Sequence, residues 1–254
     1  MSIYFANDMV TGLEPNEARS ANYKGNASMF TAGQLDQLAS IMHIKKCKAG
    51  AYLFWEGDEA NSIYWVRKGL IKLRKSTNEG KDLLLSIAQP NDLIADIDAW
   101  DTTHRYSAEA INDVEVGVIS RLQLELLMSR SGEFAYRFAM WMSHIQRQTE
   151  SKLRDLLMGS KNVALASTLI RLSNSFGVMQ PDGILIDIKL TNSELAELAG
   201  TTREGVNRLL GTMKAEGVIE QTSGGTIRIC SLEKLTQIAG CPTCPACPVE
   251  ICRI

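Results

Sequence analysis

The first half of the chain alternates short apolar segments with single glycines, and this pattern restricts the fold more than any other feature. Gly50, Gly57, Gly69 and Gly80 lie at intervals typical of turns. The segments between and after them are rich in branched and aromatic residues, which favour strands: 51–55, 62–66, 70–74, 83–87, 93–94, 107–110 and 114–119. Many short strands at such spacing predict an antiparallel barrel or jelly roll.

Helical patterns flank these strands. Apolar residues at helical spacing predict a helix from Phe30 to about Lys46, a short helix over 122–128 and a long helix over 131–158. In the long helix, residues at alternating spacings of four and three form a seam with a 3.5-residue period: Phe134, Phe138, Trp141, Ile145, Gln148, Lys152 and Asp155. Exposed aromatic side chains are costly in water, so the seam predicts a parallel homodimer. The alternative is a helix that packs on its own barrel.

The last third of the chain has the pattern of a winged helix-turn-helix. Thr191 followed by Glu194 is a capping-box signature, and Gly200 can supply the positive φ of a tight turn between helices over 191–198 and 202–216. Segments 217–222 and 226–229 alternate around a Gly-Gly pair that suits a hairpin. A helix over 163–174 and a strand over 183–189 precede these elements.

The second helix of this motif carries the expected DNA-reading residues. Arg203, Glu204, Asn207 and Arg208 fall on its polar face near its start, where such helices reach the major groove. Arginine suits guanine, and glutamate accepts a hydrogen bond from cytosine. Asn207 suits adenine or a phosphate. The alternative is a three-helix packing unit whose surface charges form salt bridges.

Composition limits the other possibilities. A length of 254 residues suits two modest domains. Net charge is −2, and residues 160–230 contain seven basic and seven acidic side chains, so bulk charge does not indicate a nucleic-acid partner. The N-terminus lacks the pattern of a secretory signal, and no apolar run approaches the ~20 residues of a membrane span. We therefore expect a cytoplasmic protein with no membrane partner.

Four of the six cysteines lie at the end of the chain: Cys241, Cys244, Cys247 and Cys252. Three of them precede proline, which stiffens the loop around a bound group. An iron–sulfur cluster, a zinc ion and a disulfide switch all suit this spacing. A thiol–disulfide enzyme is the least favoured interpretation, because the sequence supplies no partner base, and we expect no enzyme activity.

The order of barrel, long helix and winged helix resembles the cyclic-AMP-receptor/FNR (CRP/FNR) superfamily of transcription regulators from Phe30 to the end. Segments 50–57 and 63–71 are similar to its barrel signature, and 203–208 to its recognition helix, where Gly205 replaces the usual Thr or Ser.

The resemblance implies an α+β fold. It comprises an extension (1–29), a cyclic-nucleotide-binding-like β-roll (30–130), a dimerisation helix (131–159), a winged helix-turn-helix (160–232) and a cysteine tail (233–254). It also implies palindromic double-stranded DNA and RNA polymerase as partners.

Segments 151–157, 167–177, 182–186 and 247–252 are similar to the FNR proteins of the Bacillus type. That branch regulates anaerobic genes and carries an oxygen-labile [4Fe–4S] cluster on three cysteines and one aspartate. The resemblance assigns these ligands to Cys244, Cys247, Cys252 and Asp155, with Cys241 as a possible replacement. Small-molecule gating with a structural zinc tail is the alternative.

The residues that hold cyclic nucleotides in the superfamily are changed in this chain. The stretches 95–96 and 106–107 correspond to its ribose-binding Gly-Glu and phosphate-binding Arg-Ser pairs, and Tyr106 stands where the arginine is expected. Arg105 is one residue away and is expected to point to the other face. Cyclic AMP is therefore not an expected ligand.

Overall fold

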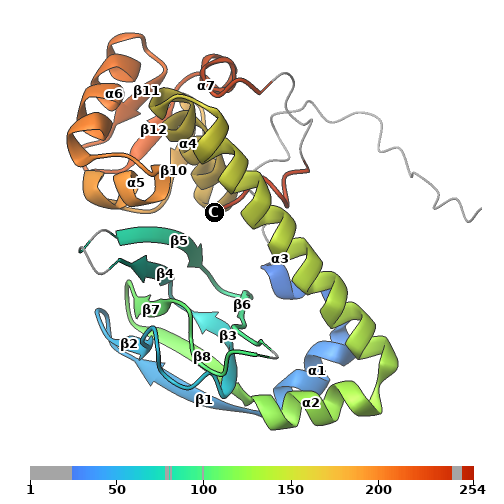
Figure 1. Ribbon diagram of the computed structural model, residues 1–254. Coiled ribbons are helices and arrows are strands. Elements are labelled where there is room, and N and C mark those ends of the chain that lie inside the picture. Colours follow the sequence, from blue (N-terminus) through green and yellow to red (C-terminus); the bar gives the residue numbers. More distant parts are fainter. Residues whose placement is uncertain (1–24, 78–79, 81, 99, 242–247) are drawn as a thin grey trace, which may run out of the picture.

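The computed structural model describes residues 25–77, 80, 82–98, 100–241 and 248–254 (Figure 1). A β-roll, a long helix and a smaller α+β domain follow one another along the chain. This arrangement confirms the fold class expected from the sequence. None of the described helices is long and apolar enough to cross a membrane.

The β-roll consists of two four-stranded antiparallel sheets. One has the strand order β1-β8-β3-β6 and the other β2-β7-β4-β5. Apolar side chains from both sheets, among them Val66, Ile71 and Val116, are fully buried between them. The strands are β1 (Met42–Cys47), β2 (Tyr52–Phe54), β3 (Ser62–Lys68), β4 (Ile71–Ser76), β5 (Asp82–Ala88), β6 (Leu93–Ile94), β7 (Ser107–Ala110) and β8 (Val114–Ser120).

The helix expected from Phe30 to Lys46 is wrong in its second half. Helix α1 (Ala32–Ser40) begins at a capping box formed by Thr31 and Gln34. The chain then continues as β1, and each of its six residues pairs with β8. Local spacing suggested a longer helix, but pairing with a strand some seventy residues away overrides it.

A short 3-10 helix, η1 (Asn26–Met29), belongs structurally to the β-roll. Ala27 is buried in its core, and the Asn26 side chain donates to the Leu93 carbonyl oxygen at 3.2 Å. The end of the expected N-terminal extension therefore packs against the first domain.

Helix α2 (Arg121–Arg130) leads into α3 (Gly132–Met158). Phe134, Phe138 and Trp141 are buried, and Phe30 packs against all three with ring centroids 5.6–6.5 Å apart. The Trp141 indole also donates to Asn26 at 3.1 Å. The expectation that these aromatic residues form a seam between two copies is wrong, because the chain's own N-terminal segment covers them.

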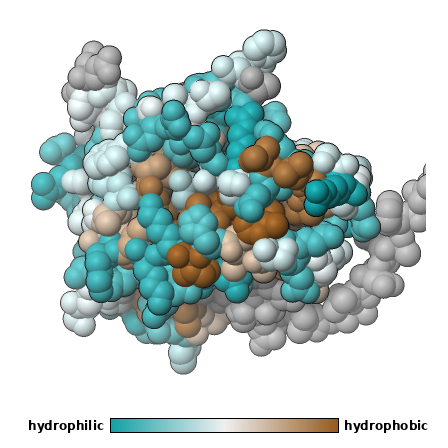
Figure 2. Space-filling view, turned by 90° about the horizontal axis from the view of Figure 1, so that it is seen from below, coloured by the Kyte–Doolittle hydropathy of each residue, from teal (hydrophilic) through white to brown (hydrophobic). Residues whose placement is uncertain are grey.

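Other residues of α3 remain exposed outside that buried stripe. The large apolar side chains among them are Tyr136, Met140, Met142, Leu153 and Leu157. Figure 2 shows a mixed surface on the side of the β-roll, where apolar patches are enclosed by polar side chains.

The C-terminal domain has the expected winged helix-turn-helix, with one strand and one helix that the sequence patterns did not reveal. These are β9 and α7. Its sheet has the order β11-β12-β10-β9. The elements are α4 (Lys161–Phe176), β9 (Gly177–Gln180), β10 (Gly183–Ile186), α5 (Asn192–Ala199), α6 (Arg203–Ala215), β11 (Ile219–Gln221), β12 (Ile227–Ile229) and α7 (Leu232–Ile238).

The two domains share an apolar core. Leu84 and Ile87 of β5 are buried among residues of α4, α5 and α6, and Figure 1 shows β5 beneath α5. Lys72 pairs with Glu194, and Arg74 lies 3.3 Å from Glu197. The first helix of the helix-turn-helix is therefore docked on the β-roll.

Candidate nucleic-acid interface and cysteine tail

The turn between α5 and α6 is built by local signals. The Thr191 hydroxyl accepts from the Glu194 amide at 3.2 Å, and the Thr191 amide donates to the Glu194 carboxylate at 2.7 Å. At the other end of α5, Gly200 has φ 57°, in the left-handed region that favours glycine. The Lys161 amine donates to the Gly200 carbonyl at 2.7 Å and ties this turn to the start of α4.

Helix α6 presents the four predicted DNA-reading residues together. It begins after Thr202, whose hydroxyl accepts from the Gly205 amide at 3.1 Å. Val206, Leu210 and Met213 are buried beneath the helix. The opposite face therefore exposes all four predicted side chains: Arg203, Glu204, Asn207 and Arg208.

Asn192 adds a contact that the sequence patterns did not reveal. It is the first residue of α5, and its side-chain NH2 group donates to the side-chain oxygen of Asn207. The NH2 group of Asn207 remains as a donor, which suits a phosphate or a base acceptor.

The wing is a short hairpin between β11 and β12. Thr222 and Thr226 join their hydroxyls at 2.7 Å across its base, and Gly225 at its tip has φ 83°. Lys189 packs against this glycine, since a Cβ there would lie 3.2 Å from the Lys189 Cε. A basic side chain from the segment between β10 and α5 therefore lies beside the tip of the wing.

Cys252 lies in a docked C-terminal segment, while Cys244 and Cys247 lie outside the described residues. The Asn174 amide donates to the Cys252 carbonyl at 2.6 Å. Cys252 and Cys241 both pack against the core of the C-terminal domain. Cys230, which follows β12, is exposed.

Asp155 lies near the end of α3, with its side chain 13% exposed. One carboxylate oxygen accepts from Arg171 Nη2 at 2.6 Å, and the other accepts from Arg154 at 2.8 Å. Arg171 Nη1 also donates to the Ile251 carbonyl at 3.2 Å. Two predicted cluster ligands, Asp155 and Cys252, are thus connected through one arginine. Within the described part of the chain, no three potential metal ligands gather at one point.

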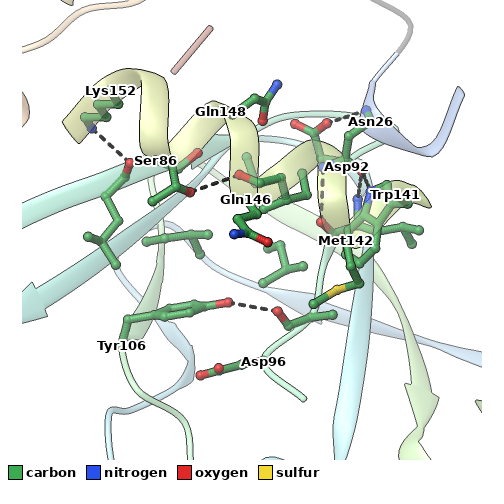
Figure 3. A pocket seen from close by; sticks show the side chains of 18 of the residues that line it. Asn26, Ser86, Asp92, Asp96, Tyr106, Trp141, Met142, Gln146, Gln148 and Lys152 are labelled. Atoms are coloured by element: carbon green, nitrogen blue, oxygen red, sulfur yellow. Dashed lines mark hydrogen bonds between the residues drawn. The ribbon is translucent and has the colours of Figure 1, made fainter. Parts of the chain in front are cut away.

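A cavity of about 1020 Å³ lies between the β-roll and α3. Figure 3 shows Tyr106 and Asp96 of the β-roll facing Gln146 and Met142 of α3 across it. Arg105 Nη2 lies 2.6 Å from Asp96 Oδ1, so this cation is already paired. Burial raises the pKa of Tyr106 above its ordinary value, which keeps the phenol neutral.

Asp96 is held ionised by its neighbours. Burial alone would raise the pKa of this carboxyl, but the adjacent His104 ring and the hydrogen bonds from Arg105 outweigh burial and lower the pKa to about 2. The wall of the cavity beside Tyr106 therefore carries a paired carboxylate.

Lys152 joins α3 to the β-roll near the same cavity. Its amine donates to the carbonyl oxygens of Leu84 at 3.0 Å and Leu85 at 2.9 Å. Burial, followed by repulsion from Arg171, lowers the pKa of Lys152 to about 7.

Comparisons with known proteins agree with this architecture. Residues 44–131 match the cyclic nucleotide-binding domain family, and residues 163–238 match the Crp-like helix-turn-helix domain family. The chain is 40% identical over 231 residues to the "Anaerobic regulatory protein" of Bacillus subtilis, covering 90% of this chain and 96% of the relative. It is 29% identical to the "Global nitrogen regulator" of Synechocystis over 67% of this chain and 77% of the relative.

Solved structures show the same fold. FixK2 from Bradyrhizobium japonicum aligns with a TM-score of 0.69 at 18% identity, over 78% of this chain and 97% of FixK2. The two matched domain families and the extensive similarity to the Bacillus relative show a DNA-binding regulator of a kind that acts as a dimer, and not an enzyme. The chain belongs to the CRP/FNR superfamily of transcription regulators.

Proposed function

We propose that this chain is an oxygen-responsive regulator of anaerobic genes, with a [4Fe–4S] cluster held by Cys244, Cys247, Cys252 and Asp155. The 40% identity to a relative named as an anaerobic regulatory protein supports the anaerobic role. We further propose that the regulator acts in the cytoplasm, reads a palindromic site and has RNA polymerase as a partner.

The observation that carries the proposal is the docking of the Cys252 segment beside Asp155. Arg171 donates both to Asp155, near the end of α3, and to the carbonyl of Ile251, next to Cys252. Thiolates together with one carboxylate form a donor set that suits iron. These residues fit the group, with Cys244 and Cys247 outside the described part of the chain. When bound, the cluster would supply an oxygen-labile crosslink between the tail and α3.

The residues of this chain would convert that crosslink into DNA affinity. The tail packs on α4, the first helix of the DNA-binding domain, and α4 follows α3 after Gly159 and Ser160. Holding the tail to the end of α3 therefore restricts the angle between the dimer helix and the DNA-binding domain. In a dimer this angle decides whether both copies of α6 reach half-sites about 34 Å apart.

The test is an anaerobic purification followed by iron, sulfide and zinc analysis and an absorbance spectrum before and after air. We expect about four iron atoms per chain and a visible absorbance that bleaches in air. The Cys252→Ser variant should lose the absorbance, whereas Cys230→Ser, at the end of the wing, should keep it. A colourless protein with one zinc per chain would contradict the proposal.

The DNA-reading part of the proposal has its own test. Arg203→Ala should weaken binding to a palindromic site by about 1–3 kcal/mol and relax the preference for one G·C pair. Fluorescence anisotropy at fixed salt measures both effects. Lys234→Ala is the control. The Lys234 amine, on α7, donates to the Glu216 carbonyl, and its removal should change the affinity for DNA little. Equal losses on every sequence would place Arg203 on the phosphate backbone.

The cavity beside α3 favours a second candidate, a regulator gated by a small molecule with a structural zinc tail. A volume of about 1020 Å³ admits a small ligand. Cyclic AMP would find Arg105 already paired with Asp96, so calorimetric titration with cyclic AMP should give no binding heat. An air-stable zinc protein whose DNA affinity changes with a small effector would favour this candidate.

A further inference from the structure

Arg171 is a fully buried cation whose hydrogen bonds all lead away from its own helix. Its side chain lies on α4 and is 2% exposed. It donates to the Asp155 carboxylate at 2.6 Å and the Ser151 hydroxyl at 2.9 Å, both on α3. It also donates to the carbonyls of Ile251 at 3.2 Å and Arg253 at 3.3 Å. A buried guanidinium requires such partners, since an unpaired one would be strongly destabilising.

Asn174, nearly one turn further along α4, binds the carbonyl between those two. It donates to Cys252 at 2.6 Å, so Arg171 and Asn174 together hold three successive backbone carbonyls, 251–253. The tail also bonds back to α4. Arg253 donates to the Asn174 carbonyl at 2.6 Å, and the Ile254 amide donates to the Ser175 hydroxyl at 3.1 Å.

These contacts fix the position of Cys252 without using its sulfur. Every tail group bonded by Arg171 and Asn174 is a backbone carbonyl, so these bonds do not involve the Cys252 thiol. The planar fork of an arginine can reach several acceptors in fixed directions, which a lysine ammonium cannot reproduce.

We infer that Arg171 is a positioning residue that, with Asn174, clamps the C-terminal segment to α4 and brings Cys252 beside Asp155. The significance for cluster binding rests on the proposed function. The clamp itself does not depend on the proposed function, because its hydrogen bonds join two parts of the same chain. Groups that orient metal ligands in this way change metal affinity by about 10–100-fold when removed.

The direct test measures how well Cys252 is protected in the metal-free, full-length protein. Iodoacetamide is added anaerobically, and mass spectrometry follows alkylation of Cys252 and, as an internal reference, of exposed Cys230. Arg171→Gln should speed the alkylation of Cys252 by about 10-fold, with Cys230 unchanged. Arg154→Gln is the matched control, because Arg154 lies on α3 and donates to the same carboxylate.

The second readout is the iron and sulfide content after reconstitution. Arg171→Gln should retain several-fold less iron than wild type. Arg171→Lys should retain as little as Arg171→Gln, because the planar guanidinium, and not only its charge, is needed. Arg154→Gln should retain the wild-type content. Rescue by Arg171→Lys would overturn the geometric part of the inference.

A melting curve first establishes that each variant is folded. If Arg171→Gln is unfolded, Asn174→Ala carries the test, because it removes the bond to Cys252 and leaves no buried charge. Wild-type protection of Cys252 in the folded variants would overturn the clamp. Absence of iron and sulfide from wild-type protein would instead refute the proposed function, while the alkylation rates would still decide the clamp.

Discussion

At the scale of single residues, Asp96 determines which ligands the β-roll can accept. It occupies the cavity wall beside Tyr106 and binds Arg105 through both its backbone amide and its guanidinium. A phosphate would have to displace this carboxylate to reach the nearby cation. The same pairing stabilises the β-roll, because a carboxyl with a depressed pKa favours the folded state wherever it is ionised.

Asp96→Asn should lower the free energy of unfolding by about 2 kcal/mol near neutral pH, as the pKa of Asp96 is lowered to about 2 from an ordinary value near 3.9. The folded pKa is the lower one, so the contribution is complete above about pH 4 and is lost as pH falls through 2. Urea titrations of both proteins from pH 7 to pH 2.5 should show the difference shrinking.

Asp98→Asn is the matched control for this experiment. Asp98 pairs with the same guanidinium at 3.3 Å but lies at the surface, so its removal should change stability much less. A pH-independent difference between wild type and Asp96→Asn would show that the lost contacts, and not ionisation, cause the effect.

At the scale of secondary-structure elements, α5, its turn and α6 are specified almost entirely by local signals. Thr191, Glu194, Gly200 and Thr202 each perform the capping or turning role that their types and spacing predict. Elements defined by distant partners are less predictable. The buried stripe of α3 resembles a dimer seam in sequence, and its contacts with distant Phe30 and Asn26 show otherwise.

Two glycines of this motif should respond oppositely to alanine. Gly200→Ala places a Cβ in a left-handed conformation and should destabilise the protein by about 1–2 kcal/mol. Gly211 lies within α6 with no atom within 4 Å of an added Cβ, so Gly211→Ala should stabilise by up to about 1 kcal/mol. Thermal melts of the two variants check both signs, and a stabilised Gly200→Ala would contradict the assigned turn.

At the scale of the whole molecule, we expect the dimer contact to involve the part of α3 outside the aromatic stripe, where large apolar side chains are exposed. Leu153 is 52% exposed and Leu157 is 73% exposed, which is costly for large apolar side chains in a lone subunit. The contacts of the tail with α3 and α4 are also properties of the whole chain. Arg171 and Ile251 are separated by 80 residues, and no local sequence pattern predicts the contact between them.

The variant Leu153→Glu/Leu157→Glu should shift the protein from dimer to monomer and abolish high-affinity binding to a palindrome. Sedimentation velocity measures the first effect and anisotropy the second. Leu122→Glu replaces another exposed leucine, on α2, and should remain dimeric. A dimer that survives the double substitution would place the contact elsewhere on the molecule.

The shared core between β5 and the C-terminal domain has a consequence for how the protein unfolds. Because Leu84 and Ile87 are buried among residues of the DNA-binding domain, cutting the chain after α3 would expose apolar surface on both fragments. The domain boundary expected from the sequence is thus not the boundary of a unit that unfolds cooperatively. Strand β5 would unfold together with the winged helix. A destabilising substitution in this strand would therefore lower the local stability of the DNA-reading surface.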